Sequence, residues 1–184
     1  MKKVFQIIIL NCFAFSCYAK SQTGIYMTAS DYKQRHLSYE MDSSKIRLNH
    51  SVWDMPYITV KVHGKKRRLN KSEVYAYVDH GREVYRFYKN EEYLIAEVGN
   101  MNIYLQAERI SLSKGYEVKM RYYFSTTPEG EIIPLTTENL INAYRNNGRY
   151  IDLLDQFLNN GNVTSYDKAH GTFKVNYIYA KALK

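Results

Sequence analysis

The chain has 184 residues and is basic, with 26 Lys and Arg against 18 Asp and Glu, and 19 of its residues are tyrosine. Its two cysteines, Cys12 and Cys17, both lie within the first nineteen residues. From Lys20 onward the sequence therefore excludes disulfide bonds, a thiol nucleophile and a thiolate metal site. A chain of this length can bury enough apolar surface to fold on its core alone, and we expect one domain.

The N-terminal segment, residues 1–19, has the layout of a secretory signal peptide. Lys2-Lys3 is a basic start, Val4–Phe15 is a short apolar run, and Ala19 is a small residue at a suitable cleavage point. The run is shorter than the roughly 20 apolar residues that cross a bilayer. Cleavage after Ala19 predicts a free exported protein, periplasmic or extracellular. Alternatively, the residues before Cys17 resemble a lipobox, and lipidation of Cys17 would anchor the chain to the envelope.

Beyond the signal segment, short alternating runs separated by Gly, Asn and Asp turns predict an antiparallel β meander or half-barrel. The richness in tyrosine fits this prediction, because tyrosine favours strands and tolerates one wet end. The expected strands are, in chain order, Gly24–Met27, Tyr57–Val62, Glu73–Val78, Glu83–Tyr88, Tyr93–Val98, Asn102–Ala107, Tyr116–Ser125 and Glu131–Ile133. After the first strand, Ser30 is the expected cap of a short helix.

Near residues 137–158 the apolar period becomes helical. Thr136 or Thr137 can cap a first helix, and a second starts near Arg149. One apolar face of the second helix holds Tyr150, Leu153, Leu154, Phe157 and Leu158. The sequence therefore predicts an α+β domain over residues 20–184, with a C-terminal helix pair packed on the sheet. The tail Phe173–Tyr179 alternates and is predicted as a strand, with a helix as the alternative.

Few residue patterns in the chain point to catalysis. The five histidines form no HxH, HxxxH or HExxH pair, and no GxSxG, GxGxxG or Walker motif is present. We therefore predict no metal and no cofactor. A hydrolytic site assembled from distant residues, for example Asp54, Asp79, His80 and Glu108, stays compatible with the sequence.

Four consecutive cations follow Gly64, namely Lys65, Lys66, Arg67 and Arg68. Such a block suits an anionic lipid, glycan or nucleic acid, and export argues against nucleic acid. A solvated hairpin turn is the alternative explanation. Together with the nearby Tyr75 and Tyr77, the block is the expected contact surface for an envelope protein or an anionic glycan or lipid surface.

Three runs carry a resemblance: GIYMTASDY (Gly24–Tyr32), VYRFYKNEEYLI (Val84–Ile95) and LINAYRNNGRYIDLLDQF (Leu140–Phe157). They resemble small exported proteins of Bacteroidetes-type bacteria that carry no assigned function. The resemblance implies an envelope setting and supplies no catalytic residues. Export, the richness in tyrosine and the missing catalytic motifs lead us to expect a non-enzymatic binding or structural module for a protein or a surface glycan. Two alternatives stay open: a carrier of lipid or another small ligand, and a glycan or peptidoglycan hydrolase.

Overall fold

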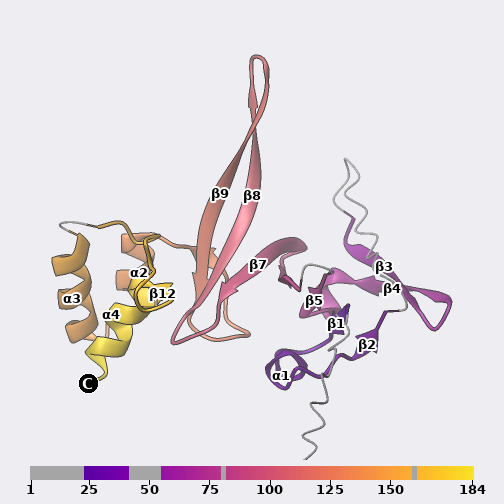
Figure 1. The fold of residues 1–184 in the computed structure, drawn as a ribbon, viewed down its shortest axis with the longest axis horizontal. Helices are drawn as coiled ribbons and strands as arrows, with labels where there is room; N and C mark the ends of the chain where they lie inside the picture. The colour runs from indigo at the N-terminus through magenta and orange to yellow at the C-terminus, as the bar shows by residue number, and fades with distance from the viewer. Residues whose placement is uncertain (1–22, 42–54, 80–81, 159–160) are drawn as a thin grey trace, which may run out of the picture.

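The computed structural model describes residues 23–41, 55–79, 82–158 and 161–184, so the predicted signal segment, with Cys17 and Ala19, lies outside the described residues. Its centre is an antiparallel sheet in the order β10-β9-β8-β7-β6-β5-β1-β2 (Figure 1). The strands are β1 (Gly24–Tyr26), β2 (Tyr39–Glu40), β5 (Ala76–Val78), β6 (Val84–Tyr88), β7 (Glu91–Glu97), β8 (Asn102–Leu112), β9 (Gly115–Ser125) and β10 (Ile133–Pro134). From β5 to β10 each strand pairs with the next one in the chain. The predicted α+β meander is thus confirmed.

The tight hairpin turns use residues with positive φ. Lys89 (φ 50°) and Asn90 (φ 68°) join β6 to β7. His63 (φ 48°) and Gly64 (φ 75°) join β3 (Tyr57–Val62) to β4 (Lys65–Asn70). Two successive residues of positive φ form the turn whose twist matches that of paired strands. Because this turn is complete at Gly64, the basic run lies in the paired strand that follows the turn, where Lys65–Arg68 are all exposed. A solvated surface without a partner therefore stays an alternative.

Three helices cover one face of β8 and β9: α2 (Thr137–Ala143), α3 (Gly148–Leu158) and α4 (Lys174–Ala182). The core cluster beneath them joins Ile103 and Phe124 of the sheet to Leu140, Leu154 and Ile178 of the helices. The Thr136 side chain caps α2 by accepting a hydrogen bond from a backbone N–H of its first turn. The helix pair predicted near residues 137–158 is therefore confirmed.

The C-terminal tail is mainly helical, so the strand predicted for Phe173–Tyr179 is wrong. Only β12 (Thr172–Phe173) is extended, and it pairs with β11 (Tyr166–Asp167). α4 begins at the next residue, and it buries Val175, Ile178 and Ala182 at the i, i+3, i+7 spacing of a helix face. On other sides of this helix, Tyr177 contacts the His170 ring, and Tyr179 contacts the rings of Tyr144 and Tyr150.

The first helix, α1 (Ala29–Lys33), is capped by Thr28 rather than by the predicted Ser30. Thr28 and Asp31 exchange two hydrogen bonds of 3.0 Å between side chain and backbone, which is a capping box. Hydrogen bonds from Ser38 and Thr28 hold the pKa of the Asp31 carboxyl below its usual range. This arrangement fixes the short helix against β1.

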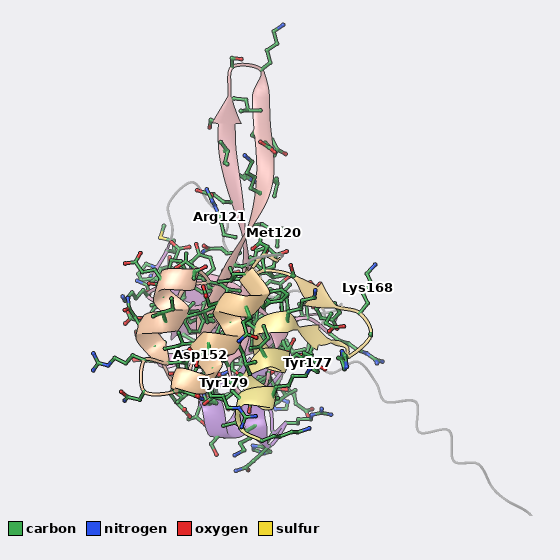
Figure 2. All side chains as sticks on the ribbon, turned by 90° about the vertical axis from the view of Figure 1, so that its left-hand side faces the viewer. Met120, Arg121, Asp152, Lys168, Tyr177 and Tyr179 are labelled. Carbon is green, nitrogen blue, oxygen red and sulfur yellow. The ribbon has the colours of Figure 1, made fainter. Side chains whose placement is uncertain are left out.

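β8 and β9 continue beyond the rest of the sheet as a two-stranded hairpin, and we call residues 107–120 the arm. β7 pairs with β8 only as far as Leu105, and β10 reaches β9 only as far as Tyr122. Figures 1 and 2 show the arm standing away from the body, with Met120 near its base. The predicted strand ended at Ala107, whereas β8 runs to Leu112. Weak alternation of apolar residues in the β8 half of the arm, residues 107–112, explains the shortfall, since little of it is buried.

Candidate binding surfaces

β3 and β4 form a hairpin that packs on the sheet through β3, and we call Tyr57–Asn70 the basic hairpin. Ile58 and Val60 of β3 are buried in a cluster with Ile25 and Phe87 of the sheet. β4 lies outermost, and Lys65–Arg68 are all exposed. The fold thus uses the apolar half of this hairpin for packing and presents the basic half to solvent.

The basic hairpin contains no carboxylate but carries five cations: Lys61, Lys65, Lys66, Arg67 and Arg68. Lys61 lies opposite Lys66, and Arg68 lies opposite Thr59, so three cations share the outer face. Within the described part of the chain, none of the five forms an ion pair with a carboxylate. Like charges placed across a ladder destabilise it, so this arrangement keeps a local positive potential at some cost in stability.

Two tyrosine rings hold the arginines of the basic hairpin. The guanidinium carbon of Arg68 lies 3.2 Å from the ring centroid of Tyr57, and that of Arg67 lies 5.3 Å from the centroid of Tyr39. Stacking on a ring face restrains a guanidinium group while leaving the N–H donors at its edge accessible. Both arginines are therefore ordered in a way that suits recognition of anions.

Tyr75 and Tyr77, which were predicted to be part of the contact surface with the basic block, are not part of its exposed surface. Tyr77 is 2% exposed, and its hydroxyl donates to Glu92 at 2.9 Å. Tyr75 is half-buried, and its hydroxyl donates to a backbone carbonyl. Burial raises the pKa of both hydroxyls. The exposed basic surface therefore consists of Lys65–Arg68 without these two rings.

The rings that accompany the cations were missed at the sequence level. The His63-Gly64 turn sets the register of the basic hairpin, and that register places Tyr57 close to Arg68. This contact could have been found from the turn. Tyr39 belongs to β2 and reaches Arg67 only through the tertiary fold. No local pattern signals that contact.

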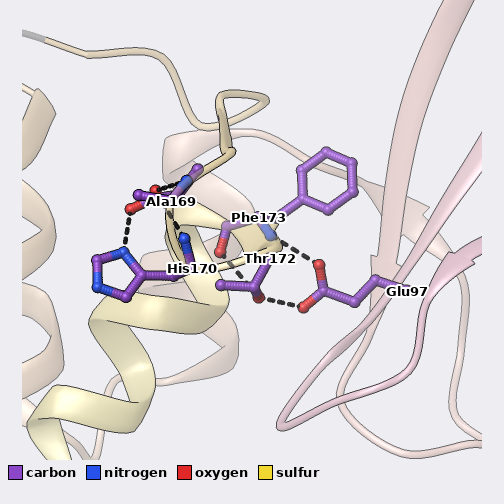
Figure 3. A network of polar contacts seen from close by, with 6 residues as sticks. Glu97, Ala169, His170, Thr172 and Phe173 are labelled. Atoms are coloured by element: carbon purple, nitrogen blue, oxygen red, sulfur yellow. Dashed lines mark hydrogen bonds and ion pairs between the residues drawn. The ribbon is translucent and has the colours of Figure 1, made fainter.

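A second polar cluster centres on Glu97 at the end of β7 (Figure 3). Its carboxylate accepts hydrogen bonds from the Thr172 hydroxyl, the Phe173 backbone N–H and the Asn176 side-chain amide, at 2.5, 2.7 and 2.7 Å. Asn176 also bonds the backbone N–H and carbonyl of Met101. The first turn of α4 has no cap from its own N-cap side chain, and the Glu97 carboxylate supplies the negative charge there. We call Glu97, Thr172, Phe173 and Asn176 the clamp.

A pocket of about 410 Å³ lies beside the clamp and is lined partly by Glu97, His170, Asn176 and Tyr177. The Nδ1 atom of His170 lies 2.9 Å from the Asp167 carboxylate, and this contact holds the pKa of the Asp167 carboxyl below its usual range. The His170 ring stacks on Tyr177, with 4.1 Å between centroids. In Figure 3 the His170 ring points away from Glu97.

The chemistry of this pocket is limited by the bonds already made. The Glu97 carboxylate accepts three hydrogen bonds, and the Thr172 hydroxyl donates its proton to it. Asp167 also accepts from two backbone N–H groups of its own turn, so its contact with His170 belongs to that turn. A histidine oriented by a carboxylate, as His170 is by Asp167, is a general-base arrangement. The neighbouring Thr172 hydroxyl, however, donates to Glu97 and not to His170.

Of the residues named for a distant hydrolytic site, the two that the structure describes belong to different parts of the sheet. Glu108 lies on the arm and pairs with Arg121, while Asp79 follows β5 and accepts a hydrogen bond from the backbone of Glu83. Asp54 and His80 lie outside the described residues. Over the described ranges, no three His, Cys, Asp or Glu side chains are grouped as metal ligands would be.

Comparison of the chain with protein-family models, curated proteins and solved structures finds no match. Among the helices of the described residues, none has the length and apolar character that crossing a membrane requires.

Proposed function

We propose that this chain is an exported, non-enzymatic binding module whose basic hairpin holds an anionic envelope glycan. The proposal rests on one observation: the basic hairpin carries five cations and no carboxylate. Lys66 and Arg68 lie about 7 Å apart on one face of β4, since residues of a strand advance by about 3.3 Å each. A polymer with repeated carboxylate, sulfate or phosphate groups can contact several of these cations in turn.

The geometry of the basic hairpin favours a polymer over a single small anion. The cations occupy both faces of the basic hairpin and are spread along its strands rather than grouped around one point. The arginines rest on tyrosine rings, which limits the side-chain entropy lost on binding. Such a surface supplies several weak, salt-dependent contacts along an extended chain.

The first experiment compares binding of an acidic polysaccharide and of neutral dextran by calorimetry at rising NaCl concentration. We expect the purified protein to bind only the acidic polymer, with an affinity that falls as salt rises. Replacing Lys61, Lys66 and Arg68 by Gln should weaken binding at least tenfold. The matched control replaces Lys168, Lys181 and Lys184, three exposed cations elsewhere, and removes the same charge.

Equal losses in the two triple variants would mean that net charge alone matters, and the assignment to the basic hairpin would be wrong. The same incubations test the hydrolase alternative, whose support is the Asp167–His170 contact beside a pocket. Release of reducing ends that disappears in His170→Gln would replace the binding proposal with a hydrolytic one. The small-ligand carrier gains little from this pocket, because polar side chains line much of it.

A further inference from the structure

The arm carries an apolar stripe that the described chain leaves largely exposed, although the Arg109 guanidinium lies over the ring of Tyr116, 5.4 Å from its centroid. Tyr116, Val118 and Met120 of β9 are 64%, 52% and 45% exposed and lie on one face. The next residues on that face, Tyr122 and Phe124, pack against the helices. The stripe is therefore the continuation of a core face beyond the point where the helical layer ends (Figure 2).

The opposite face of the arm carries charged side chains, beside Ile110 and Leu112 of β8. Glu108 pairs with Arg121 across the strands, and Glu117 pairs with Lys119 along β9. On β9 the sequence thus reads Tyr116-Glu-Val-Lys-Met120, with apolar and charged residues on alternate faces. This short segment is nearly symmetric about its central residue, except that the two charges have opposite signs.

The outer edge of β9 offers unpaired backbone groups along the arm. The Tyr122 carbonyl points away from β8, because it accepts a hydrogen bond from the Leu135 N–H on the other side. Backbone directions alternate along a strand, so the N–H and C=O groups of Tyr116, Val118 and Met120 point the same way. In the described residues no strand pairs with this edge from Gly115 to Arg121, and its midpoint is Val118.

We propose that this edge pairs antiparallel with the same edge of a second copy of the chain, about a two-fold axis at Val118. Tyr116 then lies opposite Met120 of the second copy, and Glu117 lies opposite Lys119 of the second copy. Each relation occurs twice by symmetry, as in any isologous contact. The pairing satisfies backbone groups at Tyr116, Val118 and Met120, joins the two apolar stripes and places opposite charges across the ladder.

The other edge of the arm does not complement itself. β8 is free of β7 from Gln106 to Leu112, and the midpoint of that stretch is Arg109. Antiparallel pairing about this midpoint would set two arginines directly opposite each other, which is destabilising. The charge pattern therefore selects the β9 edge over the β8 edge.

Sedimentation equilibrium of the purified chain between about 1 μM and about 300 μM measures the association directly. We expect a reversible monomer–dimer equilibrium that Val118→Pro abolishes. Proline at position 118 removes an outward N–H and leaves the bonds to β8 intact. The matched control is Arg109→Pro, the same change at the opposite position on the other edge. This control should still form dimers.

Charge exchange tests the register independently of proline. Glu117→Lys or Lys119→Glu alone should raise the dimer dissociation constant at least about tenfold, since each places like charges across the ladder twice. The double exchange should restore the wild-type constant, and circular dichroism checks that each variant folds. A wild-type chain that stays monomeric, a dimer that survives Val118→Pro, or a double exchange without recovery would each overturn the proposal.

Discussion

At the scale of single residues, Glu97 joins the C-terminal part of the chain to the sheet. Its three donors come from positions 75 or more residues away, and two of them belong to the start of α4. Hydrogen bonds to a charged group contribute more than neutral ones, and loss of the acceptor leaves donors unsatisfied. The clamp therefore concentrates long-range stabilisation in one side chain.

We expect Glu97→Ala to lower the free energy of unfolding by about 2–4 kcal/mol, because three donors lose their acceptor at once. Glu97→Gln should lower the free energy of unfolding by less than Glu97→Ala does. The glutamine oxygen can still accept a hydrogen bond, although its NH2 group then faces one of the donors. The control is Glu108→Ala, which removes an exposed ion pair and should change stability by less than about 1 kcal/mol. Urea denaturation measures all three. Equal effects of Glu97→Ala and Glu108→Ala would show that the clamp is not stabilising.

The tyrosines show which residue contacts a sequence can predict. Alternation predicted one strand over Glu73–Val78, but β5 holds only Ala76–Val78, so Tyr75 lies just before it. Alternation also did not show which face of the strand is buried. Tyr77 is buried because β3 packs over the side of β5 on which it lies. β3 and β5 belong to different sheets and do not pair with each other, so strand pairing could not predict this contact. The exposed cations were identifiable, since four adjacent charges have no buried alternative.

At the scale of elements, the arm is separable from the folded body. None of its residues belongs to a core cluster, whereas Phe124, on the same strand, is fully buried. Leu112 and Gly115 lie opposite each other and close the natural turn, and Gln106 and Arg121 lie opposite each other an even number of residues earlier. The two pairs therefore have the same hydrogen-bonding pattern. A two-residue turn can therefore close the hairpin at that point.

Replacing residues 107–120 by Asn-Gly should leave the free energy of unfolding within about 1 kcal/mol of wild type, because little buried area is removed. Phe124→Ala is the contrasting variant and should cost about 3–5 kcal/mol. Urea denaturation followed by circular dichroism compares the two. A loss above about 2 kcal/mol for the shortened chain would mean that the arm supports the core.

The helices differ in how well the sequence defined them. α3 has its apolar residues on one face and ends near Asn-Asn-Gly, so its position was predictable. α4 was not, because its aromatic residues alternate and its first turn depends on Glu97, which is distant in sequence. Short elements of this kind take their structure from tertiary contacts, which local patterns do not record.

At the scale of the whole molecule, local pairing made the sheet from β5 to β10 predictable, since each strand follows its neighbour through a short turn. The position of β1 beside β5, and the packing of the basic hairpin over that end, required contacts between distant segments. The two candidate surfaces differ in the same way. The cations of the basic hairpin were evident in the sequence, while the clamp and the pocket beside it arise from the fold.

Dimerisation through the arm would give one assembly two basic hairpins. We expect Val118→Pro to bind a short acidic oligosaccharide as the wild type does, but to bind a long acidic polymer about tenfold or more weakly, because avidity is lost. Calorimetry with both ligand lengths measures this, and Arg109→Pro is the control. Equal weakening for the two lengths would indicate that proline at position 118 disturbs the basic hairpin itself.

The shape of the arm also affects how the molecule moves through solution. A slender hairpin adds friction out of proportion to its mass, so a monomer will diffuse more slowly than a sphere of the same weight. Elution volume in gel filtration would then overstate the size of the particle. Shortening the arm should raise the diffusion coefficient even where association is absent, and light scattering, which reads mass directly, separates the two effects.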